Sequence, residues 1–422
     1  MSDLFKDPSV FLRQLFDRAV MVADPMRSLA AHLPPKPPGR VVVVGAGKAS
    51  ARMAEAVEAA WGPCEGLVIT RYGYARPSQG IEIVEAAHPV PDDAGAKATV
   101  RMLDMLNSLD EGDFVLALIS GGASALLVAP VEGVSLADKQ AVNAALLSSG
   151  APIGQMNTLR KHLSRVKGGQ LAAAAYPADM LCLMISDVPG DDPAFIGSGP
   201  TVGDASTPAD ARAILAKWGI EVPPSVSTAL NHKSGVIAPG HPKLARVTNQ
   251  IYAAPAQSLA AAAALATDRG LDVRILGDAL EGEARDVAQN HAALAQQLAA
   301  AQKPGARPIL LLSGGELTVT RRGNGIGGPN AEYCLAMAIA LQAAPGIYAI
   351  ACDTDGVDGA AEIAGACITP DTLARAKTAG LSPAEALAKN DAHSFFAAIQ
   401  QQVITGPTLT NVNDFRAIYV NI

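Results

Sequence analysis

Two short segments rich in carboxylates carry the sharpest chemical signal in the sequence. Residues 186–192 read Ser-Asp-Val-Pro-Gly-Asp-Asp, and residues 353–359 read Asp-Thr-Asp-Gly-Val-Asp-Gly. Each follows an apolar run typical of a buried strand, and carboxylates on loops at strand ends serve as ligands for hard cations or as general bases. Asp187 and Asp191 are therefore candidates for metal ligands or for a catalytic base. The second segment lacks the residues that a calcium-binding EF-hand loop requires, and Asp-Gly turns are its structural alternative.

Three apolar runs end in turns of small residues, and the first of these turns combines glycines with a lysine. Residues 45–50 read Gly-Ala-Gly-Lys-Ala-Ser between a predicted strand and a predicted helix, where backbone N–H groups and the Lys48 ammonium favour a phosphate or carboxylate. The turn is not a Walker A loop, since position 42 is Val, and it is a poor dinucleotide fingerprint, since Ser50 stands at the third glycine position. A tight turn without a ligand is the structural alternative. The candidates here are Gly45 and Gly47 for the cofactor, and Lys48 and Ser50 for the substrate.

The other two turns and one glycine-rich loop repeat this arrangement. Residues 120–124 read Ser-Gly-Gly-Ala-Ser and residues 313–316 read Ser-Gly-Gly-Glu, so the main chain can approach a ligand closely in both. The loop at residues 323–330 leads into a predicted helix and could wrap an anion, with a surface loop as the alternative. Ligands of open α/β sheets bind outside the carboxyl ends of the strands. The candidate cofactor-binding residues are Ser120, Gly121, Gly122, Ser124, Gly314, Gly315, Glu316 and Asn330.

Residues 157–169 are predicted to form a basic helix that ends at two glycines. Such cations usually occupy the solvated face of a helix, but here they are concentrated in a chain with a net charge of −7. They would create a local positive field suited to a phosphorylated nucleotide or a small carboxylate. Arg160 is the candidate from this segment.

Several classes of function are disfavoured by composition. A net charge of −7 argues against nonspecific nucleic-acid binding, which needs a basic surface. The 5 cysteines are scattered and the histidines lack metal-binding spacing, so neither a disulfide framework, a zinc site nor a Ser–His–Asp triad is supported. The acidic amino terminus does not resemble a secretory signal, and no apolar run reaches the ~18 residues of a membrane span. We therefore expect a cytoplasmic protein that contacts no membrane.

The elements that must position these residues alternate between strands and helices. At 422 residues the chain exceeds one ordinary hydrophobic core, so we expect two α/β domains, and the alternation of strands and helices in the amino-terminal half predicts a mostly parallel sheet there. The proline-rich segment from Val222 to Pro242 is the boundary candidate, which places the domains at residues 1–240 and 241–422. An amphipathic helix is predicted after Asp7. Strands are predicted at residues 41–44, 67–70, 114–119, 181–185, 247–253, 273–276, 309–312, 347–351 and 417–420.

Taken together and in order, these motifs resemble those of the class II glycerate kinases. Each motif alone is weak evidence for a family, but the whole set in this order is specific and extends over nearly the whole chain. The matching segments are residues 45–49, 88–92, 119–124, 157–161, 186–191, 198–201, 313–316, 353–359 and 410–414.

The resemblance implies an amino-terminal Rossmann-like domain, a carboxyl-terminal α/β domain of the MOFRL type, and a catalytic cleft between them. It also implies ATP and Mg²⁺ as cofactors, D-glycerate as substrate and 2-phospho-D-glycerate as product. Lys48 would contact the transferred phosphate or the glycerate carboxylate. Asp187 and Asp191 would act as base or magnesium ligands, and Glu316 would bind nucleotide or metal. The further candidates are Arg160 for catalysis and substrate binding, and Asp355 and Asn413 for substrate binding.

Two other functions stay open at this point. Relatives in tartrate utilisation have been labelled hydroxypyruvate reductases, and Arg71 could accommodate the 2′-phosphate of NADP. The defective glycine fingerprint and the acidic loops favour the kinase over this NAD(P)H-dependent reductase. A non-catalytic sensor of small anions ranks third. A homodimer is compatible with the sequence, which does not determine the oligomeric state.

Overall fold

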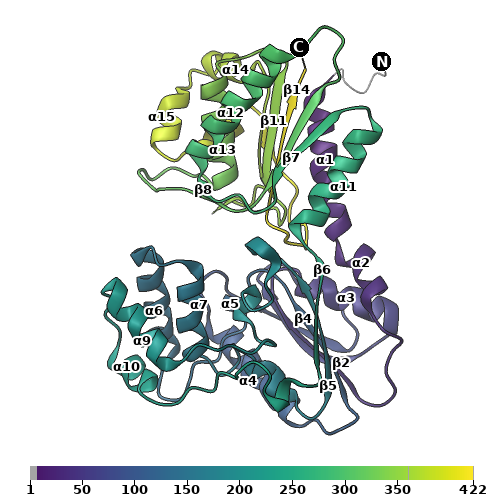
Figure 1. Cartoon of the computed structure of the whole chain (residues 1–422), viewed down its shortest axis with the longest axis vertical. Coiled ribbons are helices and arrows are strands. Elements are labelled where there is room, and N and C mark those ends of the chain that lie inside the picture. The colour runs from purple at the N-terminus through teal and green to yellow at the C-terminus, as the bar shows by residue number, and fades with distance from the viewer. Residues whose placement is uncertain (1–6, 360, 422) are drawn as a thin grey trace. The chain divides into compact units, whose positions relative to one another are not determined.

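The computed structural model describes residues 7–359 and 361–421, and the chain divides into two compact units (Figure 1). The amino-terminal unit comprises Pro25–Asp187 and Asp191–Tyr252, and the carboxyl-terminal unit comprises the residues up to Asp24, Val188–Gly190 and the residues from Ala253 onward. This division differs from the expected boundary at residue 240 in two ways. Strand β6 (Val247–Ala253) joins the amino-terminal sheet, and helix α1 (Pro8–Ala23) packs within the carboxyl-terminal unit.

The amino-terminal unit is built on a six-stranded sheet with the order β3-β2-β1-β4-β5-β6. The first five strands pair in parallel, as the alternation of strands and helices predicts. In doubly wound folds of this order the topological switch point lies between β1 and β4, where ligands commonly bind. The turns after these two strands are therefore neighbours. The remaining bounds are β1 (Val41–Ala46), β2 (Glu65–Arg71), β3 (Ile81–Ala86), β4 (Phe114–Ile119) and β5 (Asp179–Ile185).

A cluster of helices lies beside this sheet and has its own hydrophobic core. Residues such as Val142, Leu146, Leu159 and Leu215 form that core, and Figure 1 shows α6, α7, α9 and α10 gathered together to the left of the strands. The helices α6 and α9 each begin with a capping box, which satisfies N–H groups of the first turn. The helices of the unit are α2 (Pro25–Ser28), α3 (Ser50–Trp61), α4 (Asp93–Asn107), α5 (Ala123–Leu126), α6 (Leu136–Ser149), α7 (Ile153–His162), α8 (Gln170–Ala175), α9 (Pro208–Trp218) and α10 (Pro224–Leu230).

The carboxyl-terminal unit contains a second six-stranded sheet with the order β13-β12-β11-β14-β9-β7. Only β7 and β9 pair in parallel among these strands, and the other four pairings are antiparallel. This unit is thus α/β with a mixed sheet. Strand β14 runs antiparallel to both of its neighbours, β11 and β9, and β12 runs antiparallel to β11 and β13. The strands are β7 (Asp272–Gly277), β8 (Gly282–Glu283), β9 (Ile309–Gly314), β10 (Leu317–Thr318), β11 (Ile347–Asp353), β12 (Gly365–Ile368), β13 (Gln402–Val403) and β14 (Asp414–Val420).

Helices cover both faces of this second sheet. Leu310 and Leu312 of β9 share a core with α1 and α11, whereas Ile309 and Leu311 share a core with α12 and α13. This alternation follows from the two-residue period of a strand. The remaining helices are α11 (Pro255–Asp268), α12 (Ala284–Ala301), α13 (Pro329–Leu341), α14 (Thr372–Thr378), α15 (Pro383–Ala388) and α16 (Ala392–Ala398).

Two further local predictions need correction. Strand β3, with its half-buried and partly charged sequence, was not predicted because it lacks a continuous apolar run. The basic segment is helical only as far as His162, and residues 163–169 then form turns before α8 begins. This early end places Lys167 outside the helix.

Candidate functional site

The turns after β1 and β4 are hydrogen-bonded to each other at the switch point. The Lys48 N–H donates to the carbonyl oxygen of Gly121 at 2.8 Å, and the Ala49 N–H donates to Ser120 Oγ at 3.1 Å. Gly47 lies so close to Ser120 that a Cβ atom there would be 2.1 Å from Ser120 Oγ. The two turns thus form one rigid support for the Lys48 side chain.

This packing uses the backbone donors that were expected to bind an anion. The N–H groups of Gly47, Lys48, Ala49 and Ser50 all donate to acceptors within the chain. The Ser50 side chain is fully buried, and its hydroxyl donates to the carbonyl oxygen of Leu118. The structure therefore gives a packing reason for these small residues. Ligand binding by Gly45, Gly47 and Ser50 stays a prediction, as does cofactor binding by Ser120 and Gly121.

Gly122 separates the side chains of Lys48 and His88. Its φ of +83° is in the left-handed region, and an added Cβ atom would lie 3.1 Å from the His88 ring and 3.2 Å from Lys48 Cγ. His88, Gly122 and Ser124 line a pocket of about 270 Å³ within the amino-terminal unit. Lys48, which is half-buried, therefore lies beside this pocket.

Three cationic side chains from the helical cluster also line the pocket. Lys139 belongs to α6, Arg160 to α7, and Lys167 to the turn that follows. The Lys139 ammonium donates to the carbonyl oxygen of Leu163 at 3.0 Å, and the Lys167 ammonium donates to that of Ser124 at 2.8 Å. Arg160 donates to the side-chain oxygens of two asparagines, Asn143 and Asn157. Among the described residues, these three cations have neutral partners only.

Burial changes the titration of this cluster. Desolvation, together with the charge of Arg160, lowers the pKa of Lys139 to about 7. Desolvation also lowers the pKa of Lys167 well below its usual value, and the charges of Lys139 and Arg160 add to the effect. The pocket is therefore a place where an anion would relieve repulsion between the protein's own charges.

The acidic segment after β5 has one feature that fits a cation. Asp187 and Asp191 are half-buried, and Oδ1 of Asp191 is buried without a hydrogen-bond partner. A carboxylate oxygen in this state is a suitable ligand for Mg²⁺, which commonly takes one or two protein carboxylates together with phosphate oxygens. No group of three or more His, Cys, Asp or Glu residues with metal-binding geometry occurs in the described part of the chain. The residues thus fit a magnesium ion that is coordinated partly by a nucleotide better than a metal ion coordinated by protein groups alone.

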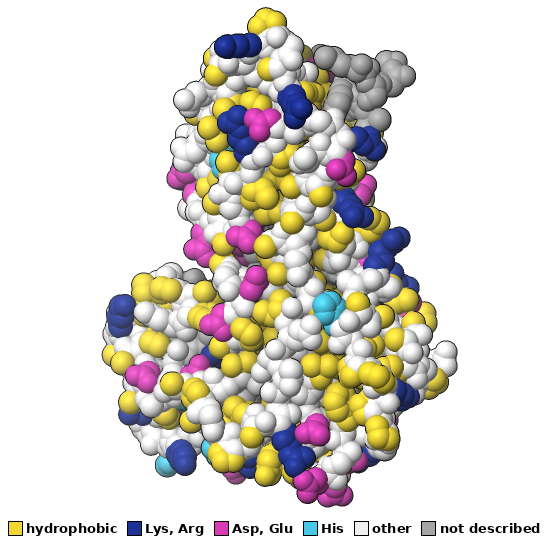
Figure 2. All heavy atoms as spheres, turned by 45° about the vertical axis from the view of Figure 1, so that its right-hand side comes forward, with side chains coloured by type: hydrophobic (Ala, Val, Ile, Leu, Met, Phe, Trp, Pro, Cys, Tyr) yellow, Lys and Arg dark blue, Asp and Glu magenta, His cyan; other side chains and the backbone are white. Residues whose placement is uncertain are grey.

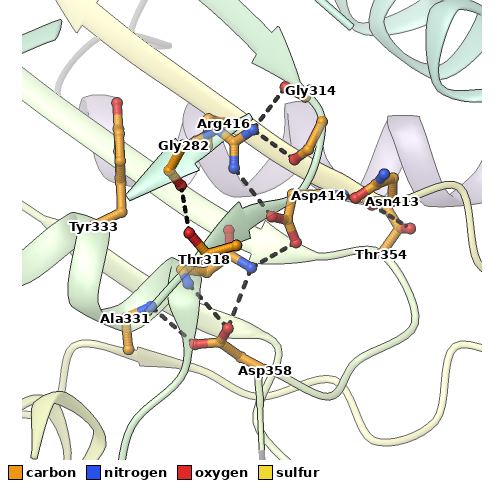
Figure 3. A network of polar contacts seen from close by, with 12 residues as sticks. Gly282, Gly314, Thr318, Ala331, Tyr333, Thr354, Asp358, Asn413, Asp414 and Arg416 are labelled. Carbon is orange, nitrogen blue, oxygen red and sulfur yellow. Dashed lines mark hydrogen bonds and ion pairs between the residues drawn. The ribbon is translucent and has the colours of Figure 1, made fainter. Parts of the chain in front are cut away.

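A second polar network lies at the ends of β9 and β14 in the carboxyl-terminal unit (Figure 3). The buried Arg416 donates to the carbonyl oxygens of Gly314 and Gly315 at 2.6 and 2.7 Å, and it pairs with Asp414 at 3.0 Å. Desolvation raises the pKa of Asp414 to about 6, against the opposing effect of Arg416. Arg416 therefore fixes the turn that presents Glu316, whose side chain is exposed.

The start of α13 is already occupied by a carboxylate of the chain itself. Asp358 accepts hydrogen bonds from the N–H groups of Asn330 and Ala331, and the Asn330 amide bridges Asp358 and Asp414. The glycine-rich loop before it is packed on residues 389–391, which accept its N–H groups. A helix N-terminus that could have bound an anion is thus neutralised internally. Cofactor binding by Asn330 stays a prediction.

The loops after β11 and before β14 are also tied together. Asp355 is buried and accepts from the N–H of Val357, and Asn413 has a φ of +66°. The carbonyl oxygen of Asn413 accepts from the backbone N–H and the hydroxyl of Thr354. These hydrogen bonds hold the two loops together, and substrate binding by Asp355 and Asn413 stays a prediction.

Sequence reasoning did not single out Lys139, Lys167 or Arg416. Lys139 stands in helix α6, where a lysine usually faces solvent, and Arg416 stands within an otherwise apolar strand. A charged residue inside an apolar run was the available signal for Arg416. Lys167 lies in the basic segment, which predicted a local positive field, whereas nothing local marked Lys139; the burial of both lysines depends on elements distant in sequence.

One face of the molecule carries charges of both signs (Figure 2). On the face drawn in Figure 2, Lys and Arg side chains are scattered among Asp and Glu side chains. None of the described helices has the length and apolar character needed to cross a membrane.

Comparison with known families assigns this architecture to a class. Residues 11–231 match the family described as Domain of unknown function (DUF4147), and residues 309–414 match the MOFRL family. The crystal structure of a glycerate kinase from Thermotoga maritima matches with a TM-score of 0.87 and 36% identity, covering 99% of this chain and 100% of that one. The protein is thus a two-domain α/β protein in which the DUF4147 and MOFRL regions follow each other.

Curated relatives narrow this class to one family. A protein of Agrobacterium vitis that carries the name hydroxypyruvate reductase is 52% identical over 97% of this chain and 94% of its own length. The D-glycerate 2-kinase of Thermotoga maritima is 38% identical over 95% of both chains, and human glycerate kinase is 33% identical over 97% of this chain and 92% of its own. The chain belongs to the glycerate 2-kinase family and is an enzyme of that family. The resemblance found in the motifs is thereby confirmed, as is the two-domain α/β fold.

Proposed function

We propose that this enzyme transfers a phosphoryl group from ATP to D-glycerate with the help of Mg²⁺ and forms 2-phospho-D-glycerate. The observation that carries the proposal is the joined pair of turns after β1 and β4, which holds Lys48 beside a pocket lined by three cations. Phosphoryl transfer depends mainly on positioning the reactants and neutralising the charge of the transferred group. The relatives named glycerate kinase support the choice of acceptor.

Each group has a proposed part in this reaction. Lys48 neutralises charge on the transferred phosphoryl group or anchors the glycerate carboxylate. Asp187 or Asp191 takes the proton of the attacking hydroxyl, and both can hold magnesium, which neutralises charge on phosphate oxygens when bound. Glu316 contacts the nucleotide or the metal. The proposed supporting contacts are Ser120, Gly121, Gly122, Ser124, Gly314, Gly315 and Asn330 to the nucleotide, and Arg160, Asp355 and Asn413 to glycerate.

A second candidate function is the NAD(P)H-dependent reduction of hydroxypyruvate. The strand order and the name of the relative from Agrobacterium vitis favour it. A dinucleotide, however, needs free N–H groups at the first turn for its pyrophosphate. Residues 47–50 donate all of these groups within the chain. The reductase therefore ranks below the kinase.

One set of assays separates the two. Purified protein should form ADP from ATP only when D-glycerate and magnesium are both present, and phosphorus NMR should identify the product as the 2-phosphate. The same preparation should not oxidise NADH or NADPH when hydroxypyruvate is added. Nicotinamide oxidation without ADP formation would reverse the assignment, and the 3-phosphate as product would correct only the position of transfer.

A further inference from the structure

The cationic side chains that are buried in this protein fall into two groups. Among the described residues the buried lysines and arginines are Lys139, Lys161, Lys167 and Arg416. Lys161 pairs with Asp204 at 2.5 Å and Arg416 pairs with Asp414 at 3.0 Å, as is usual for charges removed from water. Lys139 and Lys167 have no such carboxylate and instead line the pocket. Their counter-charge must therefore come from something that enters the pocket, or they must lose their protons.

We propose that Lys139, Arg160 and Lys167 form a subsite for a small anionic group, a carboxylate or a phosphate, that one of the reactants carries. This inference rests on the proposed kinase function for the identity of the reactants, but not for the existence of the anion site. It adds Lys139 and Lys167 to the residues that bind ligands.

The hydrogen-bonding capacity of the cluster supports this assignment. An ammonium group has three donors and a guanidinium five. Lys139 uses one donor, on the carbonyl oxygen of Leu163, and Arg160 uses three, on Asn143 and Asn157. Donors therefore remain on Lys139 and Arg160 beside the pocket. The Lys167 ammonium has three acceptors within the chain, on Ser124 and Gly197, so it contributes positive charge to the subsite and not a hydrogen bond. Carboxylate and phosphate oxygens accept several hydrogen bonds at once, so they match this arrangement better than a neutral ligand does.

The neighbours of Lys139 explain why such a ligand would bring a proton with it. Arg160 from α7, Lys167 from the turn after α7 and His88 from the segment after β3 line the same pocket, and none of them supplies a negative charge. Because the pKa of Lys139 is lowered to about 7, much of the ammonium is deprotonated at pH 8. A bound anion would raise this pKa again, since an opposite charge favours the charged form. Binding at pH 8 should then be accompanied by proton uptake.

The rest of the pocket does not decide which reactant supplies the anion. Val142, Leu146 and Leu147 form an apolar wall on α6, which could face the carbon chain of glycerate or the base of a nucleotide. Lys48 lies next to Gly122 at the same pocket. The glycerate carboxylate and a nucleotide phosphate are therefore the two sources that an experiment has to distinguish.

The test uses the full chain and the variants Lys139→Met and Lys167→Met. Arg165→Met is the matched control, since Arg165 is exposed in the same segment and does not line the pocket. Titration calorimetry with inorganic phosphate, D-glycerate and ATP at pH 8, in buffers of different ionisation enthalpy, measures affinity and proton uptake. Steady-state kinetics give KM for each reactant.

We expect wild type and Arg165→Met to take up a proton with one of the ligands, and Lys139→Met to lose that uptake. A KM raised at least ~10-fold for glycerate alone would identify the carboxylate as the anion, and one raised for ATP alone would identify a phosphate. If Lys139→Met fails to fold, Arg160→Met serves in its place, because Arg160 is only half-buried. Unchanged KM values and unchanged proton uptake in the folded variants would overturn the subsite, even if the wild type proves to be a glycerate kinase. Conversely, proton-linked binding in a wild type that forms no ADP would support the subsite while refuting the proposed reaction.

Discussion

Gly122 is the position where a single methyl group tests the site most directly. In Gly122→Ala the new Cβ atom would lie 3.1 Å from the His88 ring and 3.2 Å from Lys48 Cγ, which is closer than side chains normally pack. One of the two side chains must move by a few tenths of an ångström. The residue also keeps a φ of +83°, which costs an L-amino acid roughly 1–2 kcal/mol. The substitution therefore has a stability effect and a separate effect on the site.

Gly219→Ala provides the control that separates these effects. Gly219 also has a left-handed conformation, with φ at +61°, but nothing lies within 4 Å of its added Cβ atom. Both variants should lose similar stability, about 1–2 kcal/mol in denaturant unfolding. A displacement of about 1 Å at a reacting group can cost roughly 10²-fold in rate, so a smaller shift of Lys48 should lower kcat of Gly122→Ala by roughly 10-fold or more. Gly219→Ala should keep the wild-type kcat. Equal kinetics in the two variants would show that Lys48 and His88 have no part in the reaction.

Two further substitutions test the charged groups. Lys48→Met should lower kcat by roughly 10²–10³-fold if the ammonium stabilises the transferred phosphoryl group. If the ammonium instead anchors the glycerate carboxylate, KM for glycerate should rise at constant kcat. Wild-type values of both kcat and KM would show that Lys48 is not part of the site. Arg416→Met leaves Asp414 buried without its cation and should cost about 3–5 kcal/mol in the free energy of unfolding near pH 8. Because burial raises the pKa of Asp414 to about 6, above the ordinary value of 3.8, the carboxyl group favours the folded state at low pH and this contribution is lost as the pH rises through about 6. The loss of stability in Arg416→Met should therefore be smaller at pH 5 than at pH 8, and a penalty independent of pH would contradict the assignment of the buried charge.

Local sequence determined many of the elements and the places where chemistry could occur. The continuous β-branched run at Val41–Val44 and the apolar run at Phe114–Ile119 have few alternatives to buried strands, and the glycines after them mark turns. Asp7 caps the first helix as its position before a proline predicts. These properties depend on neighbours within a few residues. The motifs in their order then indicated the family, and the comparisons with known proteins confirm it.

Only the tertiary structure decided which of those segments lie next to each other and which of their polar groups remain available to a ligand. The order of the strands brings Lys48 next to Gly121, and no local pattern encodes that order. The same packing uses the N–H groups of the first turn, which the sequence alone would assign to an anion. The exposure of Lys139 and Lys167 likewise depends on how α6, α7 and the turns around them pack, so a lysine that reads as a surface residue lies instead in a desolvated pocket. The physical reason is that burial, and with it the pKa and the free hydrogen-bonding capacity of a group, is a property of contacts between segments that are distant along the chain.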